Sequence, residues 1–196
     1  MGGYAVAFLV AVGVTAACML PVRRLAIRLG AVVPPNPRGV HTSPLVSLGG
    51  AGMFVGFLVA MAVAWRVPQF QEMFNGSSEP LGVVLAAAVM FAVGALDDLR
   101  DVSPPAKIAG MVLAGGLLSL FGVQMLFFRV PFFSTDTIVL AADLAPIVTV
   151  LMVVLFANAI NLIDGLDGLA GGIVAIAGTA LFLYSDRLDR KSTRLN

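Results

Sequence analysis

The sequence predicts an all-α protein, a polytopic bundle of about six transmembrane helices. Of its 196 residues, 59% are hydrophobic and only 12% are charged, against roughly 25% charged residues in an ordinary soluble domain. Several apolar stretches without any charge approach the roughly 20 residues that a helix needs to cross the hydrocarbon core of a bilayer. A water-soluble fold of this size could not bury so much apolar surface, so we expect the chain to lie in a membrane.

Hydropathy predicts where the helices lie. The predicted spans cover residues 4–22, 48–67, 81–96, 106–123, 144–160 and 168–184. The first span lacks the basic start of a signal peptide, so we expect it to be retained. It holds the single cysteine, Cys18, which is expected to be a small packing residue. Between residues 124 and 143, four phenylalanines mixed with Pro131 and Asp136 predict an interfacial or hairpin-like loop.

Charge predicts the orientation of the spans. Arginine and lysine concentrate in the loops at 22–47 and 97–107, which the positive-inside rule places in the cytoplasm of a bacterial inner membrane. Consecutive spans alternate in direction, so the loops after the first, third and fifth spans share that side. These loops carry the three polar clusters of the sequence. The basic residues do not gather into one face, so no nucleic-acid partner is expected.

The first informative cluster is acidic and follows the third span. It consists of Asp97, Asp98 and Asp101, and in a continuing helix Asp101 would share a face with each of the other two. Neighbouring carboxylates repel one another, and a divalent cation relieves that repulsion. Mg²⁺ suits the place because it takes oxygen ligands and is commonly shared with substrate phosphates. The alternative is a solvated helix end, in which Arg100 and Lys107 pair with the acids.

The second cluster follows the fifth span, where polar residues recur at every third position. Asn158, Asn161 and Asp164 can share a broad helix face, and a break at the neighbouring glycines could return Asp167 to it. Amides and carboxylates at the end of a span need partners. A ligand can supply those partners, because these groups bind Mg²⁺ and accept hydrogen bonds from sugar hydroxyls. The alternative, a capped helix break, does not explain four evenly spaced polar residues.

Together these motifs resemble the polyprenyl-phosphate N-acetylhexosamine-1-phosphate transferases of bacterial cell-envelope synthesis. The resemblance covers roughly residues 20–185 and rests on three segments. These are Leu96 to Asp101, Asn158 to Ala170, and the spaced series Arg38, His41, Pro44, Gly49 and Gly50.

The resemblance implies Mg²⁺-dependent transfer of a sugar 1-phosphate, with Mn²⁺ as a substitute metal. The donor would be a UDP-N-acetylhexosamine, the acceptor a membrane-bound polyprenyl phosphate, and UMP the by-product. It further implies roles for individual residues. Asp97 and Asp98 would position or deprotonate the lipid phosphate, and Asn161 with Asp98 would hold the metal. The residues expected to bind substrate are His41, Asp101, Asn158, Asp164 and Asp167.

Several alternatives stay open at this point. The sugar is expected to be N-acetylglucosamine, and the runner-up is transfer of phospho-N-acetylmuramoyl-pentapeptide. Two alternatives belong to other functional classes of protein. The chain could be a cation-coupled transporter or a non-catalytic membrane subunit. The lipid length, the glycan pathway and the oligomeric state, a homodimer among the options, are not decided by the sequence.

The resemblance also bears on the extent of the domain. Residues 1–185 would be the N-terminal part of a single transferase domain, truncated at its C-terminal side and inactive alone. Residues 186–196 have the character of an artefactual tail.

Overall fold

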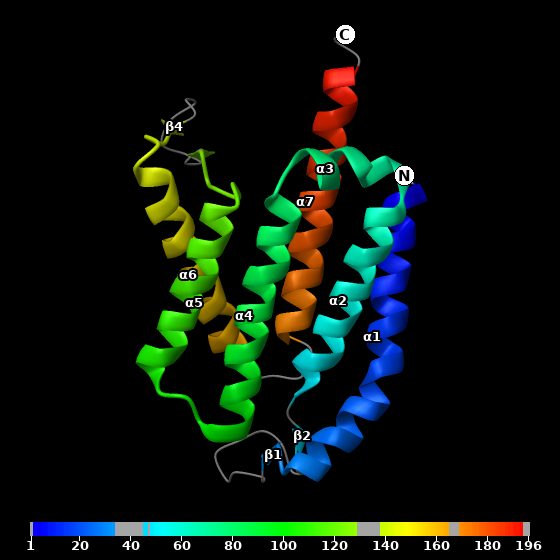
Figure 1. The fold of residues 1–196 in the computed structure, drawn as a ribbon, viewed down its shortest axis with the longest axis vertical. Helices are drawn as coiled ribbons and strands as arrows, with labels where there is room; N and C mark the ends of the chain where they lie inside the picture. The colour runs from blue at the N-terminus through cyan, green and yellow to red at the C-terminus, as the bar shows by residue number, and fades with distance from the viewer. Residues whose placement is uncertain (1, 34–44, 47, 129–137, 165–168, 194–196) are drawn as a thin grey trace. The chain divides into compact units, whose positions relative to one another are not determined.

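Helices make up most of the computed structural model, which describes residues 2–33, 45 and 46, 48–128, 138–164 and 169–193 (Figure 1). Six main helices correspond to the six predicted spans, which confirms the predicted all-α bundle. They are α1 (Gly2–Leu29), α2 (Gly49–Arg66), α4 (Glu79–Arg100), α5 (Pro104–Leu120), α6 (Leu144–Ile163) and α7 (Leu169–Thr193).

Short elements connect these helices. A 3-10 turn, η1 (Pro68–Phe70), and the short helix α3 (Gln71–Gly76) link α2 to α4. The antiparallel strands β1 (Val32–Val33) and β2 (Leu45–Val46) lie between α1 and α2. Between α5 and α6, β3 (Phe127–Phe128) pairs antiparallel with β4 (Ile138–Val139), so the predicted hairpin-like character of this segment is confirmed.

The helices have the length and composition of membrane spans. Helices α1, α2, α4 and α6 each have at least 18 residues and are apolar enough to cross a bilayer, and α5 and Leu169–Ser185 of α7 are shorter apolar helices. Large apolar side chains such as Phe8, Leu155 and Ile176 are exposed, as expected of surfaces that face lipid or further helices. The chain is therefore a multi-pass membrane protein.

The chain divides into two compact units, Met1–Val154 and Leu155–Asn196. The first unit contains α1 to α5 and the beginning of α6, and the second contains the end of α6 and α7. Each unit is described by itself below.

Small residues bring the helices of the first unit close together. Gly52 and Gly56 of α2 are buried against α1, where a Cβ atom at Gly56 would overlap the Thr15 hydroxyl and lie 2.9 Å from the Ala11 carbonyl oxygen. Close approach at glycine is typical of membrane helix pairs, because dispersion contacts replace the hydrophobic effect there. Helix α2 also packs on α4 through the stacked rings of Phe54 and Phe91, whose centroids are 4.6 Å apart.

Helix α1 is longer than predicted. It continues through Pro21, past the predicted end at residue 22, because the following residues are good helix formers and a proline removes only one backbone hydrogen bond. The helix ends where Gly30 adopts a φ of 75° and the Ala31 N–H donates to the Ala26 carbonyl oxygen at 2.9 Å. This is the hydrogen-bond pattern of a glycine-terminated helix. Helix α7 likewise continues past the predicted end at residue 184, to Thr193.

A buried threonine joins α6 to the segment after α5. The Thr149 hydroxyl donates to the Ala145 carbonyl oxygen at 2.7 Å and accepts from the Met125 N–H at 2.9 Å.

Replacing Thr149 with valine keeps the shape of the side chain but leaves the Met125 N–H without this acceptor. We expect a loss of about 1–3 kcal/mol in stability, whereas Thr149→Ser should retain most of the stability because the hydroxyl remains. Thermal unfolding of both variants in detergent tests this difference. Equal stabilities of the two variants would show that the hydrogen bond contributes nothing measurable.

Candidate active site at the end of α4

Two acids of the cluster, Asp97 and Asp98, lie on the last turn of α4 and not in a loop. The helix runs to Arg100, past the predicted end at residue 96, so Asp97 and Asp98 are helical residues. Carboxylates at a helix C-terminus face the negative end of the helix dipole, which disfavours them. Their position therefore requires compensating donors from other elements, and the structure supplies two.

The first compensating group is the Lys107 ammonium. Its Nζ lies 2.7 Å from Asp97 Oδ1, and the same oxygen accepts the Val102 N–H at 3.0 Å. Lys107 belongs to the first turns of α5, where the positive end of the dipole disfavours a cation. The ion pair thus offsets an unfavourable charge at each helix end. The alternative to a metal site was a solvated helix end in which Arg100 and Lys107 pair with the acids. The pairing of Lys107 in that alternative is confirmed.

The second compensating group is the backbone of Leu48, at the start of α2. Its N–H donates to Asp98 Oδ2 at 2.8 Å. Leu48 is the N-cap residue of α2, and its own side chain makes no capping hydrogen bond. The carboxylate of Asp98, supplied by α4, accepts a hydrogen bond at the positive end of α2, where a negative charge is favoured.

Asp101 departs from the expected arrangement. The continuing helix in which it would share a face with Asp97 and Asp98 does not exist, because α4 ends at Arg100 and Asp101 adopts a left-handed φ of 47°. Its N–H still donates to the Asp97 carbonyl oxygen at 3.2 Å. Aspartate tolerates this conformation better than most residues, and Pro104 and Pro105 begin α5 directly afterwards.

The sequence predicts that three polar segments share one side: residues 34–50 after the first span, the acidic cluster, and the asparagine series. Leu48, near the end of residues 34–50, donates its N–H to Asp98 of the acidic cluster. In Figure 1, β1, β2, the start of α2 and the ends of α1 and α4 gather at the same end of the first unit. This contact agrees with the prediction that the start of α2 and the acidic cluster lie at the same end of the bundle.

The asparagine series belongs to the second unit. Asn158 and Asn161 lie on the last turns of α6 and are exposed, and Asp164 follows the helix directly. The Asp164 N–H donates to the Ile160 carbonyl oxygen at 3.0 Å, so the helical pattern reaches this residue. The predicted common face of these three polar residues is thus compatible with the observed helix. Helix α7 begins after the glycines, at Leu169.

Two predicted site residues, His41 and Asp167, lie outside the described residues. Among the residues that are described, no group of three histidine, cysteine or acidic side chains could hold a metal ion. The donor types nevertheless suit Mg²⁺, which takes carboxylate and amide oxygens and completes its shell with water and substrate phosphate. Asp98 and Asn161 offer such oxygens, one in each unit.

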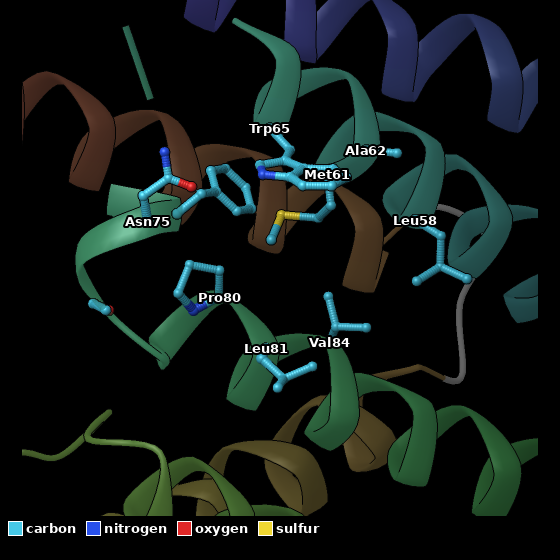
Figure 2. Close-up of a pocket in the computed structure, with 10 residues that line it drawn as sticks. Leu58, Met61, Ala62, Trp65, Asn75, Pro80, Leu81 and Val84 are labelled. Atoms are coloured by element: carbon cyan, nitrogen blue, oxygen red, sulfur yellow. The ribbon is translucent and has the colours of Figure 1, made fainter. Parts of the chain in front are cut away.

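A separate cavity lies at the other end of α2 and α4. It has a volume of about 520 Å³ and is lined mainly by apolar side chains, including Met61, Trp65, Leu81 and Val84, with Asn75 at its edge (Figure 2). None of the predicted site residues lines it. The acidic cluster is therefore the candidate site in the first unit.

The ion pair at the site is partly exposed, which limits its contribution to stability. The side chains of Lys107 and Asp97 keep 33% and 32% of their accessible surface, and ion pairs in such positions contribute about 0–1 kcal/mol. We therefore expect Lys107→Met to change the free energy of unfolding by less than about 1 kcal/mol. Chemical denaturation in detergent measures it. A loss well above that value would mean that the pair is more shielded from water than its exposure indicates.

Known proteins resemble this chain over most of its length. It is 36% identical over 179 residues to the decaprenyl-phosphate N-acetylglucosaminephosphotransferase of Mycobacterium tuberculosis, covering 89% of this chain and 44% of that protein. It is also 36% identical to a probable undecaprenyl-phosphate N-acetylglucosaminyl 1-phosphate transferase of Bacillus subtilis, over 79% of this chain and 40% of the relative. A phospho-N-acetylmuramoyl-pentapeptide-transferase of Chlorobium chlorochromatii is 40% identical over 52% of this chain and 32% of its own length.

The chain thus spans less than half the length of these relatives. No solved structure matches it significantly. The sequence model of glycosyl transferase family 4 matches residues 80–194, which include the acidic cluster and the asparagine series. With this match over more than half of its residues, the chain belongs to glycosyl transferase family 4.

Proposed function

We propose that the protein transfers N-acetylglucosamine 1-phosphate from a UDP-sugar to a polyprenyl phosphate and releases UMP. The observation that carries this proposal is the 36% identity to the M. tuberculosis N-acetylglucosaminephosphotransferase across 89% of this chain. The acidic cluster at the end of α4 supports it, because the pair Asp97 and Asp98 provides negative charge and oxygen ligands at a helix end. The product would begin the synthesis of a cell-envelope glycan.

The chemistry would be a phosphoryl transfer at the β-phosphorus of the UDP-sugar. An oxygen of the lipid phosphate forms a new bond to this phosphorus, while the bond to the oxygen that bridges the two phosphates breaks. UMP leaves with that oxygen, and the product is a lipid-linked sugar diphosphate. Such reactions depend mainly on alignment and on neutralising the charge on the phosphate oxygens.

Each predicted site residue has a place in this scheme. Asp97 and Asp98 would position the lipid phosphate or accept its proton, and Lys107 beside Asp97 limits the repulsion that two carboxylates would exert on it. Asn158, Asp164 and Asp167 would shape the nucleotide-sugar pocket. Asp101 would bind substrate, and His41 would bind phosphate or the sugar. When bound, Mg²⁺ or Mn²⁺ would neutralise phosphate charge, and Asp98 with Asn161 would hold it.

The proposed setting is the bacterial inner membrane, with the acidic cluster on the cytoplasmic side. The basic residues of the loops after α1 and α4 support this orientation, and a nucleotide sugar would be available there. A cation-coupled transporter usually carries its ionisable groups near the bilayer midplane, on broken helices. Asp97 and Asp98 instead lie at the end of an intact helix, which favours the enzyme. A homodimer remains a proposal.

A comparison of two donors tests the proposed substrate. We expect membranes from cells that express the native gene to release UMP from UDP-N-acetylglucosamine in the presence of undecaprenyl phosphate. EDTA should abolish the release, and added Mg²⁺ should restore it. The second donor is UDP-N-acetylmuramoyl-pentapeptide, which the similarity to the C. chlorochromatii protein makes the runner-up. Release with this donor alone would move the protein to that activity, and no release with either would refute the proposal.

A further inference from the structure

We infer that Asp98 also positions the start of α2, by accepting a hydrogen bond from the backbone of Leu48. The inference deepens the proposed function and rests on it, because it assigns to one site residue a second task at the same site. The same hydrogen bond holds the Asp98 carboxylate, so Leu48 is in turn a positioning residue, which acts through Asp98 and not on the substrate.

The backbone of Leu48 is the first observation. Its φ of 71° places it in the left-handed region, which non-glycine residues rarely adopt because the Cβ atom crowds the backbone. Conformations of this kind persist only where surrounding contacts impose them, and they concentrate at functional sites. Leu48 is thus a place where the fold accepts an unfavourable backbone conformation.

The contacts around Leu48 come from α4 and from α1 with the residue Ala31 that follows it. The Leu48 N–H donates to Asp98 Oδ2 at 2.8 Å. The Leu48 side chain is 7% exposed and belongs to a small core with Ala26 and Ala31, against which Ala95 of α4 packs. Ala95 and Asp98 are three residues apart and therefore lie on the same face of α4. One face of α4 thus holds the backbone of Leu48 through Asp98 and contributes Ala95 to the core around the Leu48 side chain.

This arrangement has a consequence for the site. Asp98 is predicted to bind the lipid phosphate and the metal. A carboxylate that also accepts a hydrogen bond from Leu48 links the start of α2 to the acidic pair. Loss of the carboxylate should therefore release the start of α2 as well as remove a ligand.

Amide hydrogen exchange at Leu48 tests this link, in protein purified from cells that express the native gene. We expect Asp98→Ala to accelerate exchange of the Leu48 amide at least tenfold. Asp98→Asn should change it less than threefold, because the asparagine oxygen can still accept the hydrogen bond. Unchanged exchange in α5 would show that both variants are folded. Exchange in Asp98→Ala within twofold of the native rate would overturn the inference.

Measuring UMP release on the same samples separates this inference from the proposed function. Both variants are expected to lose UMP release, since both lack the carboxylate charge. If Asp98→Asn keeps full release while exchange changes as expected, the catalytic role fails and the positioning role stands. If release is lost but the Leu48 amide is unaffected in both variants, the catalytic role stands and the positioning role fails.

A second pair of variants tests the backbone of Leu48 directly. Glycine adopts a positive φ without strain, whereas the β-branched valine resists it. We expect Leu48→Val to lower kcat for UMP release at least tenfold more than Leu48→Gly does. Burial alone predicts the opposite order, because valine retains more apolar surface than glycine. A Leu48→Val protein that is more active than Leu48→Gly would therefore contradict the positioning role.

Discussion

Asp98→Asn is expected to lower the rate of UMP release by about a hundredfold to a thousandfold, the usual effect of removing one group that stabilises a phosphoryl or acyl transition state. The substitution removes a charge but keeps the size of the side chain and an oxygen that can accept the Leu48 hydrogen bond. A large loss would therefore report the chemistry at this carboxylate and not a disturbed fold. The measurement is the initial rate of Mg²⁺-dependent UMP release.

The matched control for this substitution is Asp143→Asn. Asp143 is exposed just before α6 and is separate from the acidic cluster in the sequence. Its substitution removes the same charge, and we expect UMP release within about twofold of the native rate, as for a surface change away from a site. Equal losses in the two variants would mean that the assay responds to net charge. A fully active Asp98→Asn protein would remove Asp98 from the catalytic site.

Gly56→Leu is expected to have the largest effect on stability. The added side chain would meet the Thr15 hydroxyl and the Ala11 carbonyl oxygen, the latter already 2.9 Å from an ideal Cβ atom. Because a carbonyl oxygen of a helix cannot rotate away, α1 and α2 would have to separate. Overpacking costs about 1–3 kcal/mol and occasionally more, and we expect the upper part of this range. The measurement is the midpoint of thermal unfolding in detergent.

Gly13→Leu provides the comparison for that measurement. Gly13 lies on α1, and apart from its chain neighbours and the nearby backbone of its own helix, no described atom comes within 4 Å of an ideal Cβ atom there. Leucine is also a better helix former than glycine by roughly 1 kcal/mol. We expect this variant to be as stable as the native protein or slightly more stable. If both leucine variants unfold at the same temperature, the close contact at Gly56 does not stabilise the pair of helices.

Much of the fold follows from the sequence, because in lipid a long apolar run must form a helix that satisfies its own backbone. The residues at which the helices end were harder to predict from the sequence. The extension of α1 through Pro21 depended on arginines that hydropathy treats as loop residues, although their long side chains can reach polar surroundings from a helix. Hydropathy likewise treats Asp97 and Asp98 as loop residues, although both belong to the last turn of α4.

The partners of the two site carboxylates were predictable to different degrees. Lys107 was foreseeable as a partner of the acids, because its charge and its position after a tight turn are visible in the sequence. The hydrogen bond from Leu48 was not, since every residue but proline carries a backbone N–H. A left-handed leucine leaves no signal in composition or spacing. This partner is known only from the structure.

The position of the β-phosphate label after reaction tests the central claim most directly. The donor is UDP-N-acetylglucosamine labelled with ³²P in the phosphate next to the sugar, incubated with undecaprenyl phosphate and membranes from cells that express the native gene. Sugar 1-phosphate transfer predicts that the label moves into the lipid fraction in the same amount as UMP appears, and that Asp98→Asn lowers both about a hundredfold to a thousandfold. Label that stays with UDP while the sugar alone reaches the lipid, or no transfer at all, would contradict the account.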